Sequence, residues 1–284
     1  MKEKIFVSTT FVKDGTPISE VLEICEKAKI NNLELGSNHC WQINQRKTVC
    51  NFKSNNYLVH NYFPVPKNNF VVNIASNNNN IRKRSILHAK NCINFAKTIN
   101  AKLYTLHFGF LADPVTSNIS NKNYDFVFNE EDKNNVYYDK TFNNMINSLI
   151  EIIKYAKLKR VNIALETEGS AKKDYCFMSR AWEYEKLFKI FSKNELKLNL
   201  NLGHLFLEYS NKKDINKFLN IVKKRVVALE ISHNDGKLDQ HLPILNKAWY
   251  WNIINDKYFA NCFKILEFRN TKIKDIHRCL SYFE

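Results

Sequence analysis

Glycine is scarce in this chain. It contributes 6 of 284 residues, about 2%, where globular proteins usually have about 7%. This composition excludes a collagen-like fibre and a glycine-rich flexible polymer. We expect so few glycines to stand where the backbone requires them. They are Gly15, Gly36, Gly109, Gly169, Gly203 and Gly236.

Long apolar runs and close cysteine pairs are also lacking. No apolar run approaches the roughly 20 residues that cross a membrane as a helix, which excludes a membrane protein. The seven cysteines are odd in number, widely spaced and without a Cys-x-x-Cys pair, which excludes a disulfide scaffold. The first residues, Met1–Lys4, do not resemble a signal peptide, so we expect a reduced, cytoplasmic protein.

Dense basic blocks are absent, although Lys and Arg exceed Asp and Glu by 43 to 28, a net charge of +15. Such a charge is one mark of a polyanionic partner such as nucleic acid. The lysines are spread along the chain, however, and the longest basic stretches, near residues 81–84 and 222–225, are short. Abundant Lys, Asn and Ile also fit an AT-rich gene, so composition explains the charge without nucleic acid.

Short apolar segments alternate with longer amphipathic ones. The apolar segments predict strands because parallel strands are buried on both faces. They are Lys4–Ser8, Asn32–Leu35, Tyr57–Tyr62, Leu103–His107, Val161–Glu166, Leu198–Leu202, Val226–Ser232 and Phe263–Phe268. The predicted helices are Pro17–Ile30, Asn80–Ile99, Tyr138–Leu158, Arg180–Ser192, Asp214–Lys224 and Thr271–Tyr282, with weaker signals at Trp41–Ser54 and Leu245–Asp256. Eight such repeats without a linker predict an α/β fold, a single-domain (β/α)8 TIM barrel over residues 1–284.

Ionisable side chains follow the predicted strands at their carboxyl ends, where such barrels carry their active sites. A single His or Glu there is most often structural. Five histidines and several carboxylates converging on one rim are costly to bury without a cation, so we predict a metal site. Imidazole and carboxylate donors suit Zn, Mn, Co or Fe. The residues are His60, His107, Glu166, His204, His233, Asp239, His241 and Glu267.

Short motifs on this rim resemble the xylose-isomerase-like TIM-barrel superfamily, which contains sugar (phosphate) isomerases and epimerases together with endonuclease IV. The resemblance runs from the first strand to Glu267. Its motifs are His107–Gly109, Leu165–Glu166, Gly203–His204, His233–Gly236, Asp239–His241 and Leu266–Glu267.

The resemblance implies two overlapping sets of metal ligands. In the isomerase branch, one metal would be held by Glu166, Asn201, His233 and Glu267. Asn201 departs from the family pattern, which has Asp there, and this weakens the expected affinity. Endonuclease IV has a trinuclear zinc cluster, to which His60, His107, His204, Asp239 and His241 correspond by order and spacing. The expected cofactor is therefore one to three divalent ions of Zn, Mn or Co.

The preferred hypothesis is a metal-dependent isomerase or epimerase acting on a sugar or sugar phosphate through a cis-enediolate. Glu166 and Glu267 would act as a general acid and base. His204 would orient a hydroxyl, while Arg269 or Lys237 would hold a phosphate or oxyanion; a rim salt bridge is an equal alternative for Arg269.

Two alternatives stay open at this point. One is an endonuclease IV-like, zinc-dependent phosphodiesterase acting on abasic DNA or another phosphoester. The residues after His241, Leu242–Asn246, lack the glycine-rich turn of those nucleases, which favours a small molecule over nucleic acid. The other alternative is a non-catalytic barrel, supported only by Asn201. The sequence does not indicate the oligomeric state.

Overall fold

Eight parallel strands close into a barrel in the computed structural model, which describes residues 4–52, 56–117, 123–130 and 137–284. This confirms the (β/α)8 prediction. The strand order around the ring is β1-β10-β9-β8-β7-β4-β3-β2. The strands are β1 Ile5–Ser8, β2 Asn32–Leu35, β3 Asn56–His60, β4 Tyr104–His107, β7 Ile163–Glu166, β8 Leu198–Asn201, β9 Val226–Ile231 and β10 Phe263–Leu266.

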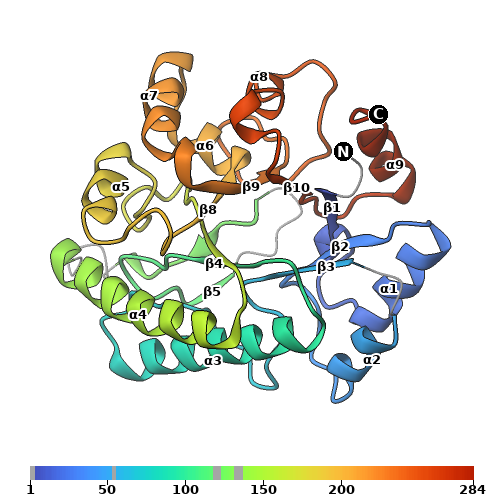
Figure 1. Ribbon diagram of the computed structural model, residues 1–284, viewed down its shortest axis with the longest axis horizontal. Helices are drawn as coiled ribbons and strands as arrows, with labels where there is room; N and C mark the ends of the chain where they lie inside the picture. Colours follow the sequence, from blue (N-terminus) through green and yellow to red (C-terminus); the bar gives the residue numbers. More distant parts are fainter. Residues whose placement is uncertain (1–3, 53–55, 118–122, 131–136) are drawn as a thin grey trace.

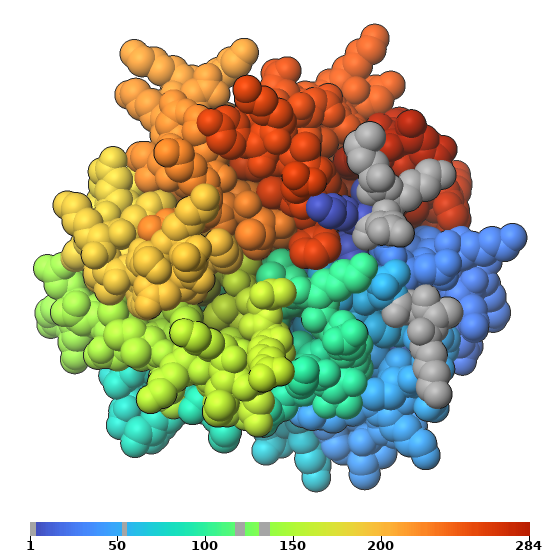
Figure 2. All heavy atoms as spheres, viewed as in Figure 1, coloured from blue at the N-terminus to red at the C-terminus, as the bar shows by residue number. Residues whose placement is uncertain are grey.

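Helices surround the ring of strands (Figure 1). They are α1 Ile18–Lys27, α2 Gln45–Asn51, α3 Asn79–Thr98, α4 Tyr138–Lys159, α5 Ala181–Phe188, α6 Leu202–Glu208, α7 Lys212–Val222, α8 Trp251–Ile254 and α9 Ile273–Ser281. The long helices α3 and α4 lie side by side along one flank of the barrel (Figure 1). The barrel closes where β1 pairs with β10, and Figure 2 shows blue atoms from the start of the chain beside red-orange ones from its end.

Two predicted helices are shorter in the structure, and two of its elements were not predicted. The expected helix Leu245–Asp256 is reduced to the four residues of α8, and Trp41–Ser54 is reduced to α2, with Ser54 outside the described residues. The helix α6 was not predicted. Nor was the two-stranded sheet of β5 Thr116–Ser117 and β6 Phe126–Val127, which comes between β4 and α4 in the chain.

Side chains inside the barrel form layers, because successive residues of a strand face opposite sides. One layer is wholly apolar and consists of Phe6, Leu58, Leu103, Ala164, Ala228 and Ile265. Two positions further along the same strands, the layer turns polar, with Ser8, His60, Thr105, Glu166, Glu230 and Glu267. The two-residue period of the strands therefore places the ionisable groups in the layer directly next to the apolar one.

Gly169 marks a close backbone approach at this end of the barrel. A Cβ atom there would lie 2.2 Å from the carbonyl oxygen of His204. The loop after β7 therefore packs directly against the first turn of α6, which brings Glu166 and His204 together. Separately, among the helices that the structure describes, none has the length and apolar character needed to cross a bilayer.

Candidate active site

A cavity of about 530 Å³ opens at the carboxyl ends of the strands. The predicted residues that line it are His60, His107, Glu166, His204, Asp239, His241, Glu267 and Arg269. Aromatic rings, among them those of Tyr62, Phe110 and Tyr124, line the same cavity. The structure therefore brings most of the predicted site residues to one place, as expected for the active face of such a barrel.

The first potential metal-binding group is His60, His107 and Glu166, on three neighbouring strands. One ligand-type atom from each lies within 4.8 Å of the others. Oε2 of Glu166 is 3.6 Å from Nε2 of His107 and 3.7 Å from Nδ1 of His60. Register explains the closeness, since His107 and Glu166 are direct partners across β4 and β7.

The second potential metal-binding group is His204 of α6 with Asp239 and His241 of the loop that follows β9. Their ligand-type atoms also lie within 4.8 Å of one another. Oδ2 of Asp239 is 3.0 Å from Nε2 of His241 and 3.9 Å from Nε2 of His204. Glu166 connects the two groups, because its Oε1 lies 3.3 Å from Nδ1 of His204.

Hydrogen bonds orient two of the imidazoles toward the cavity. Nδ1 of His204 lies 2.9 Å from the carbonyl oxygen of Thr167, to which it can only donate. Nδ1 of His107 lies 3.1 Å from the Glu168 carboxylate. Each ring is thereby left with Nε2 as the lone-pair atom, the usual arrangement of a metal-ligating histidine.

Burial and the neighbouring carboxylates act against each other on the ring pKa values. Burial would lower the pKa of His107, but Glu166 and Glu168 outweigh it and raise that pKa to about 10. His60, buried and beside His107, has its pKa lowered to about 3. Burial would likewise lower the pKa of His241, but Asp239 and Glu267 raise it well above its usual range. The carboxylates that favour a proton on these rings equally favour a cation beside them.

Unpartnered buried atoms provide a test of whether a metal fits here. Oε2 of Glu166, Oδ1 of Asp239 and Nδ1 of His241 are buried and make no hydrogen bond. Nδ1 of His241 lies 3.0 Å from Oε2 of Glu267, but the two are not aligned as a hydrogen bond. Such atoms are costly to bury, and mixed imidazole and carboxylate donors suit a divalent ion. The residues present therefore fit a metal.

Asn201 does not present an amide oxygen to the cavity. Its Oδ1 accepts a hydrogen bond from the backbone N–H of His204 and caps α6. That contact fixes the orientation of the amide, so its Nδ2 faces Glu166 at 2.9 Å and Glu230 at 3.3 Å. An amide nitrogen donates hydrogen bonds and does not bind a metal ion. The structure therefore places Asn201 as a hydrogen-bond donor between two carboxylates.

His233, predicted from the sequence as a metal ligand, is not among the described residues of either metal-binding group and does not line the cavity. Its backbone pairs with Leu242 in an antiparallel bridge, so the two side chains share one face. Leu242 is exposed, while the adjacent His241 points the opposite way, into the cavity. In the strand, the inward position next to His233 belongs to Ser232, whose hydroxyl faces Gly203. The histidine of the His233–Gly236 motif is therefore one residue beyond Ser232, the position whose side chain points toward the site.

Of the two predicted phosphate-binding residues, only Arg269 lines the cavity. Its Nη1 lies 3.2 Å from Oδ1 of Asp14, and its guanidinium lies 4.9 Å from the ring centre of Tyr124. Lys237 is exposed in the turn after Asp235 and is not among the described residues that line the cavity. The rim salt bridge considered for Arg269 is therefore present.

Sequence reasoning missed three carboxylates. Glu168 accepts from the backbone N–H of Phe108 and contacts His107. Glu34 and Glu230 are fully buried inside the barrel. The signal for the last two was available, since each is a Glu within an otherwise apolar parallel strand, where an acid is costly.

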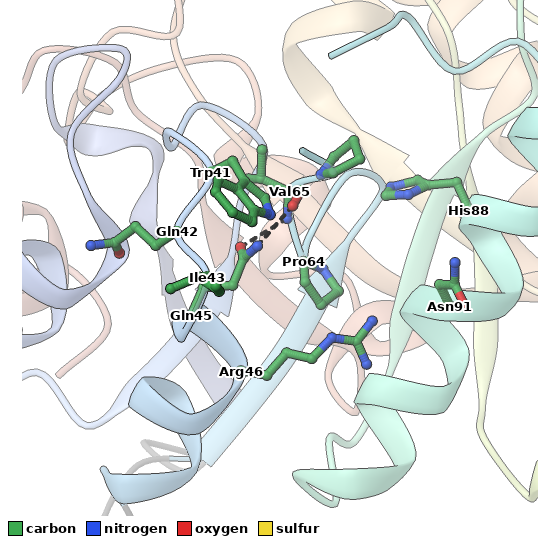
Figure 3. A pocket seen from close by; sticks show the side chains of 10 residues that line it. Trp41, Gln42, Ile43, Gln45, Arg46, Pro64, Val65, His88 and Asn91 are labelled. Carbon is green, nitrogen blue, oxygen red and sulfur yellow. Dashed lines mark hydrogen bonds between the residues drawn. The ribbon is translucent and has the colours of Figure 1, made fainter. Parts of the chain in front are cut away.

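A second hollow, of about 230 Å³, lies outside the barrel between the segment before α2 and the helix α3 (Figure 3). Trp41 and Arg46 come from one side, His88 and Asn91 from the other. Among its described lining residues, none carries a carboxylate. It therefore lacks the mixed donors of the larger cavity.

A family model described as xylose isomerase-like TIM barrel matches residues 17–281. An uncharacterized protein of Methanocaldococcus jannaschii is 27% identical over 98% of this chain and 96% of its own length.

Solved structures with the same fold include a D-tagatose 3-epimerase-like protein, with a TM-score of 0.72 and 18% identity over 99% of this chain and 97% of that one. Another is D-psicose 3-epimerase from Clostridium cellulolyticum H10 with D-tagatose, with a TM-score of 0.62 and 12% identity over 97% of this chain and 91% of that one.

Proposed function

Since the chain belongs to the xylose isomerase-like TIM barrel family, we propose that it isomerises or epimerises a sugar or sugar phosphate with a bound divalent metal. One observation carries the proposal. Glu166 and Glu267, from β7 and the end of β10, line the same cavity and are almost fully buried. Two carboxylates facing one enclosed space are the requirement for moving a proton off and onto a carbon.

The two glutamates would divide the proton transfers between them. One carboxylate removes the proton from the carbon next to the substrate carbonyl, and the electron pair moves into the carbonyl to give an enediolate. The other, protonated, returns a proton to carbon. Return to the opposite face inverts the centre, and return to the neighbouring carbon shifts the carbonyl. His204, Nδ1 of which is held by Thr167, would orient a substrate hydroxyl.

The expected cofactor is Zn, Mn or Co, in one to three ions. His60, His107 and Glu166 would hold one ion, while His204, Asp239 and His241, together with Glu267, would hold another. A bound divalent ion would polarise the substrate carbonyl and hydroxyl as a Lewis acid. All seven thiols are free and none belongs to these groups, which supports a reducing, cytoplasmic setting.

The sugar as substrate is supported by two proteins of the same fold, a D-tagatose 3-epimerase-like protein and D-psicose 3-epimerase. The cavity itself adds support, because its volume of about 530 Å³ is that of a small-molecule site. Both polar side chains and aromatic rings line the cavity. A monosaccharide, with hydroxyls on its edges and apolar faces, fits such a lining.

Exchange of carbon-bound hydrogen with solvent tests the proposal. The full chain, loaded separately with Mn²⁺, Co²⁺ and Zn²⁺, is incubated in D₂O with a panel of ketoses, aldoses and their phosphates. We expect deuterium at the carbon next to the carbonyl of one sugar. Glu166→Gln should lower the exchange rate by about 10²–10⁴-fold, since it removes a general acid or base.

Glu185→Gln provides the matched control, because Glu185 is exposed on α5 and is not among the described residues that line the cavity. Its exchange rate should equal that of the wild type. Absence of exchange on every sugar, with each of the three metals, would contradict the proposal.

Phosphoester hydrolysis is the second candidate, and the two metal-binding groups favour it. Adjacent metal sites suit the activation of water and the stabilisation of a leaving oxygen. Abasic duplex DNA and small phosphodiesters should be tested with the zinc-loaded chain. Cleavage of either, together with no exchange on sugars, would assign the site to hydrolysis.

A further inference from the structure

A third ionisable group, called the deep group below, is buried inside the barrel, and of its three members only His60 lines the cavity. Glu34 of β2, His60 of β3 and Glu230 of β9 each offer a ligand-type atom within 4.8 Å of the other two. Neither Glu34 nor Glu230 is among the described residues that line the cavity. We propose that these three residues form a separate divalent-cation site on the floor of the barrel, below the substrate cavity.

The strongest sign of a ligand is the carboxylate of Glu34. Both its oxygens are buried and neither has a hydrogen-bond partner. Burial and the charge of Glu267 raise the pKa of Glu34 well above its usual range, although the nearby hydroxyl of Ser8 acts in the opposite direction. The amide oxygen of Asn199 on β8, the strand beside the β9 strand of Glu230, is a further fully buried oxygen without a hydrogen-bond partner.

Charge balance indicates a cation. Glu166 and Glu267 each raise the pKa values of Glu34 and Glu230, and Glu34 also raises that of Glu230. Among the described residues with the largest effects on these two carboxyl groups, the single positive charge is His107, which lowers the pKa of Glu34. Two buried carboxylates neutralise one divalent ion, so an ion here removes the cost of burying them.

The second carboxylate is already oriented as a ligand would be. Asn199 donates its amide hydrogen to Oε2 of Glu230, and Asn201 donates to Oε1. Outer-shell donors of this kind usually fix ligating carboxylates. At bond lengths of about 2.1 Å, two ligands of one ion are at most about 4.2 Å apart. The three ligand-type atoms already lie within 4.8 Å of one another, so small changes of side-chain rotamer would bring them to these distances.

His60 belongs to this deep group and also to the group with His107 and Glu166. Occupancy of the two sites is therefore coupled through one imidazole. For that reason the test uses Glu34 and Glu230, which belong to the deep group alone, and leaves His60 unchanged.

The proposal is tested by counting bound metal without any sugar. The full chain is stripped with a chelator, titrated with ZnCl₂ near neutral pH and assayed for bound zinc by mass spectrometry and calorimetry. Glu34→Gln and Glu230→Gln should each bind one zinc fewer per chain than the wild type. Glu26→Gln, at an exposed position on α1, should match the wild type. Equal zinc in all four proteins would overturn the proposal.

Crystals of the wild-type chain grown with ZnCl₂ provide a test that needs no variant. An anomalous-difference peak bounded by Glu34, His60 and Glu230 is expected. Peaks confined to the two groups nearer the cavity would overturn the deep site. Because neither experiment includes a sugar, failure of the deep site leaves the proposed epimerisation standing, and the reverse also holds.

Discussion

The side-chain amide of Asn201 donates a hydrogen bond to the carboxylate of Glu166, with Nδ2 2.9 Å from Oε1. The same amide uses its oxygen to cap α6 through the N–H of His204. Asn201 therefore does two things at once. It begins the helix that carries His204, and it holds a carboxylate of the cavity without adding a negative charge.

Replacing Asn201 by Asp tests this role. Asn201→Asp keeps the cap but places a third carboxylate against Glu166 and Glu230, so we expect the metal-stripped chain to lose about 1–3 kcal/mol of unfolding free energy. Zinc affinity should rise because one negative charge is added. Denaturant unfolding with chelator and with ZnCl₂ measures both. Unchanged stability in chelator would mean that the amide does not contact Glu166.

Glu168 is predicted to position His107. Its carboxylate accepts hydrogen bonds from Nδ1 of His107 and from the backbone N–H of Phe108. Glu168→Ala therefore removes the contact that orients the His107 ring. Loss of such an outer-shell partner usually lowers metal affinity by about 10–100-fold. Zinc affinity measured by competition with a chromogenic chelator tests this. Glu185→Gln should show wild-type affinity, and equal affinity of Glu168→Ala would contradict the assignment.

Two glycines form a matched pair for testing the contact between β7 and α6. In Gly169→Ala, the new Cβ would meet the backbone of His204 at 2.2 Å, so we expect a loss of about 1–3 kcal/mol and reduced zinc binding.

Gly15→Ala meets nothing within 4 Å, although its φ of +84° disfavours a side chain. We expect it to cost about 1–2 kcal/mol with unchanged zinc binding. Thermal unfolding and zinc titration separate the two cases. Loss of zinc binding in both variants would show that the effect of Gly169 is not local.

The buried His88 predicts part of the acid sensitivity of the fold (Figure 3). Burial lowers its pKa from 6.5 to about 4. The charged or titratable groups facing it are Tyr62, Arg46, Arg84 and Cys92. Because the folded pKa is below the unfolded one, the contribution of neutral His88 to the unfolding free energy is complete above pH 6.5. This contribution decreases as pH falls, and the loss of unfolding free energy reaches about 3 kcal/mol at pH 4.

His88→Gln should remove this slope. Between pH 6.5 and 4 the unfolding free energy of the variant should fall less than that of the wild type. Asn91→Ala, which changes the same hollow without removing a titrating group, should keep the wild-type slope. Parallel curves for all three proteins would show that His88 does not titrate as described.

Much of the site could be predicted because its residues follow strand ends. His107 and Glu166 each end an apolar strand, and parallel strands bring their carboxyl ends to one rim. His233 lies outside the two metal-binding groups for a reason within one strand. Side chains alternate between the inside and the outside of the barrel along a strand, and here Ser232 points inward while His233 does not. The motif alone does not reveal which of its residues points inward.

Composition and strand patterning by themselves determined the barrel, since eight buried parallel strands alternating with amphipathic helices have few other closed arrangements. They also determined that His and carboxylate side chains meet at one end. Only the tertiary structure decided how those side chains face. Register placed His107 opposite Glu166, a helix cap turned the amide of Asn201 away from ligation, and ring closure gathered Glu34 and Glu230, 196 positions apart in sequence, into one buried group.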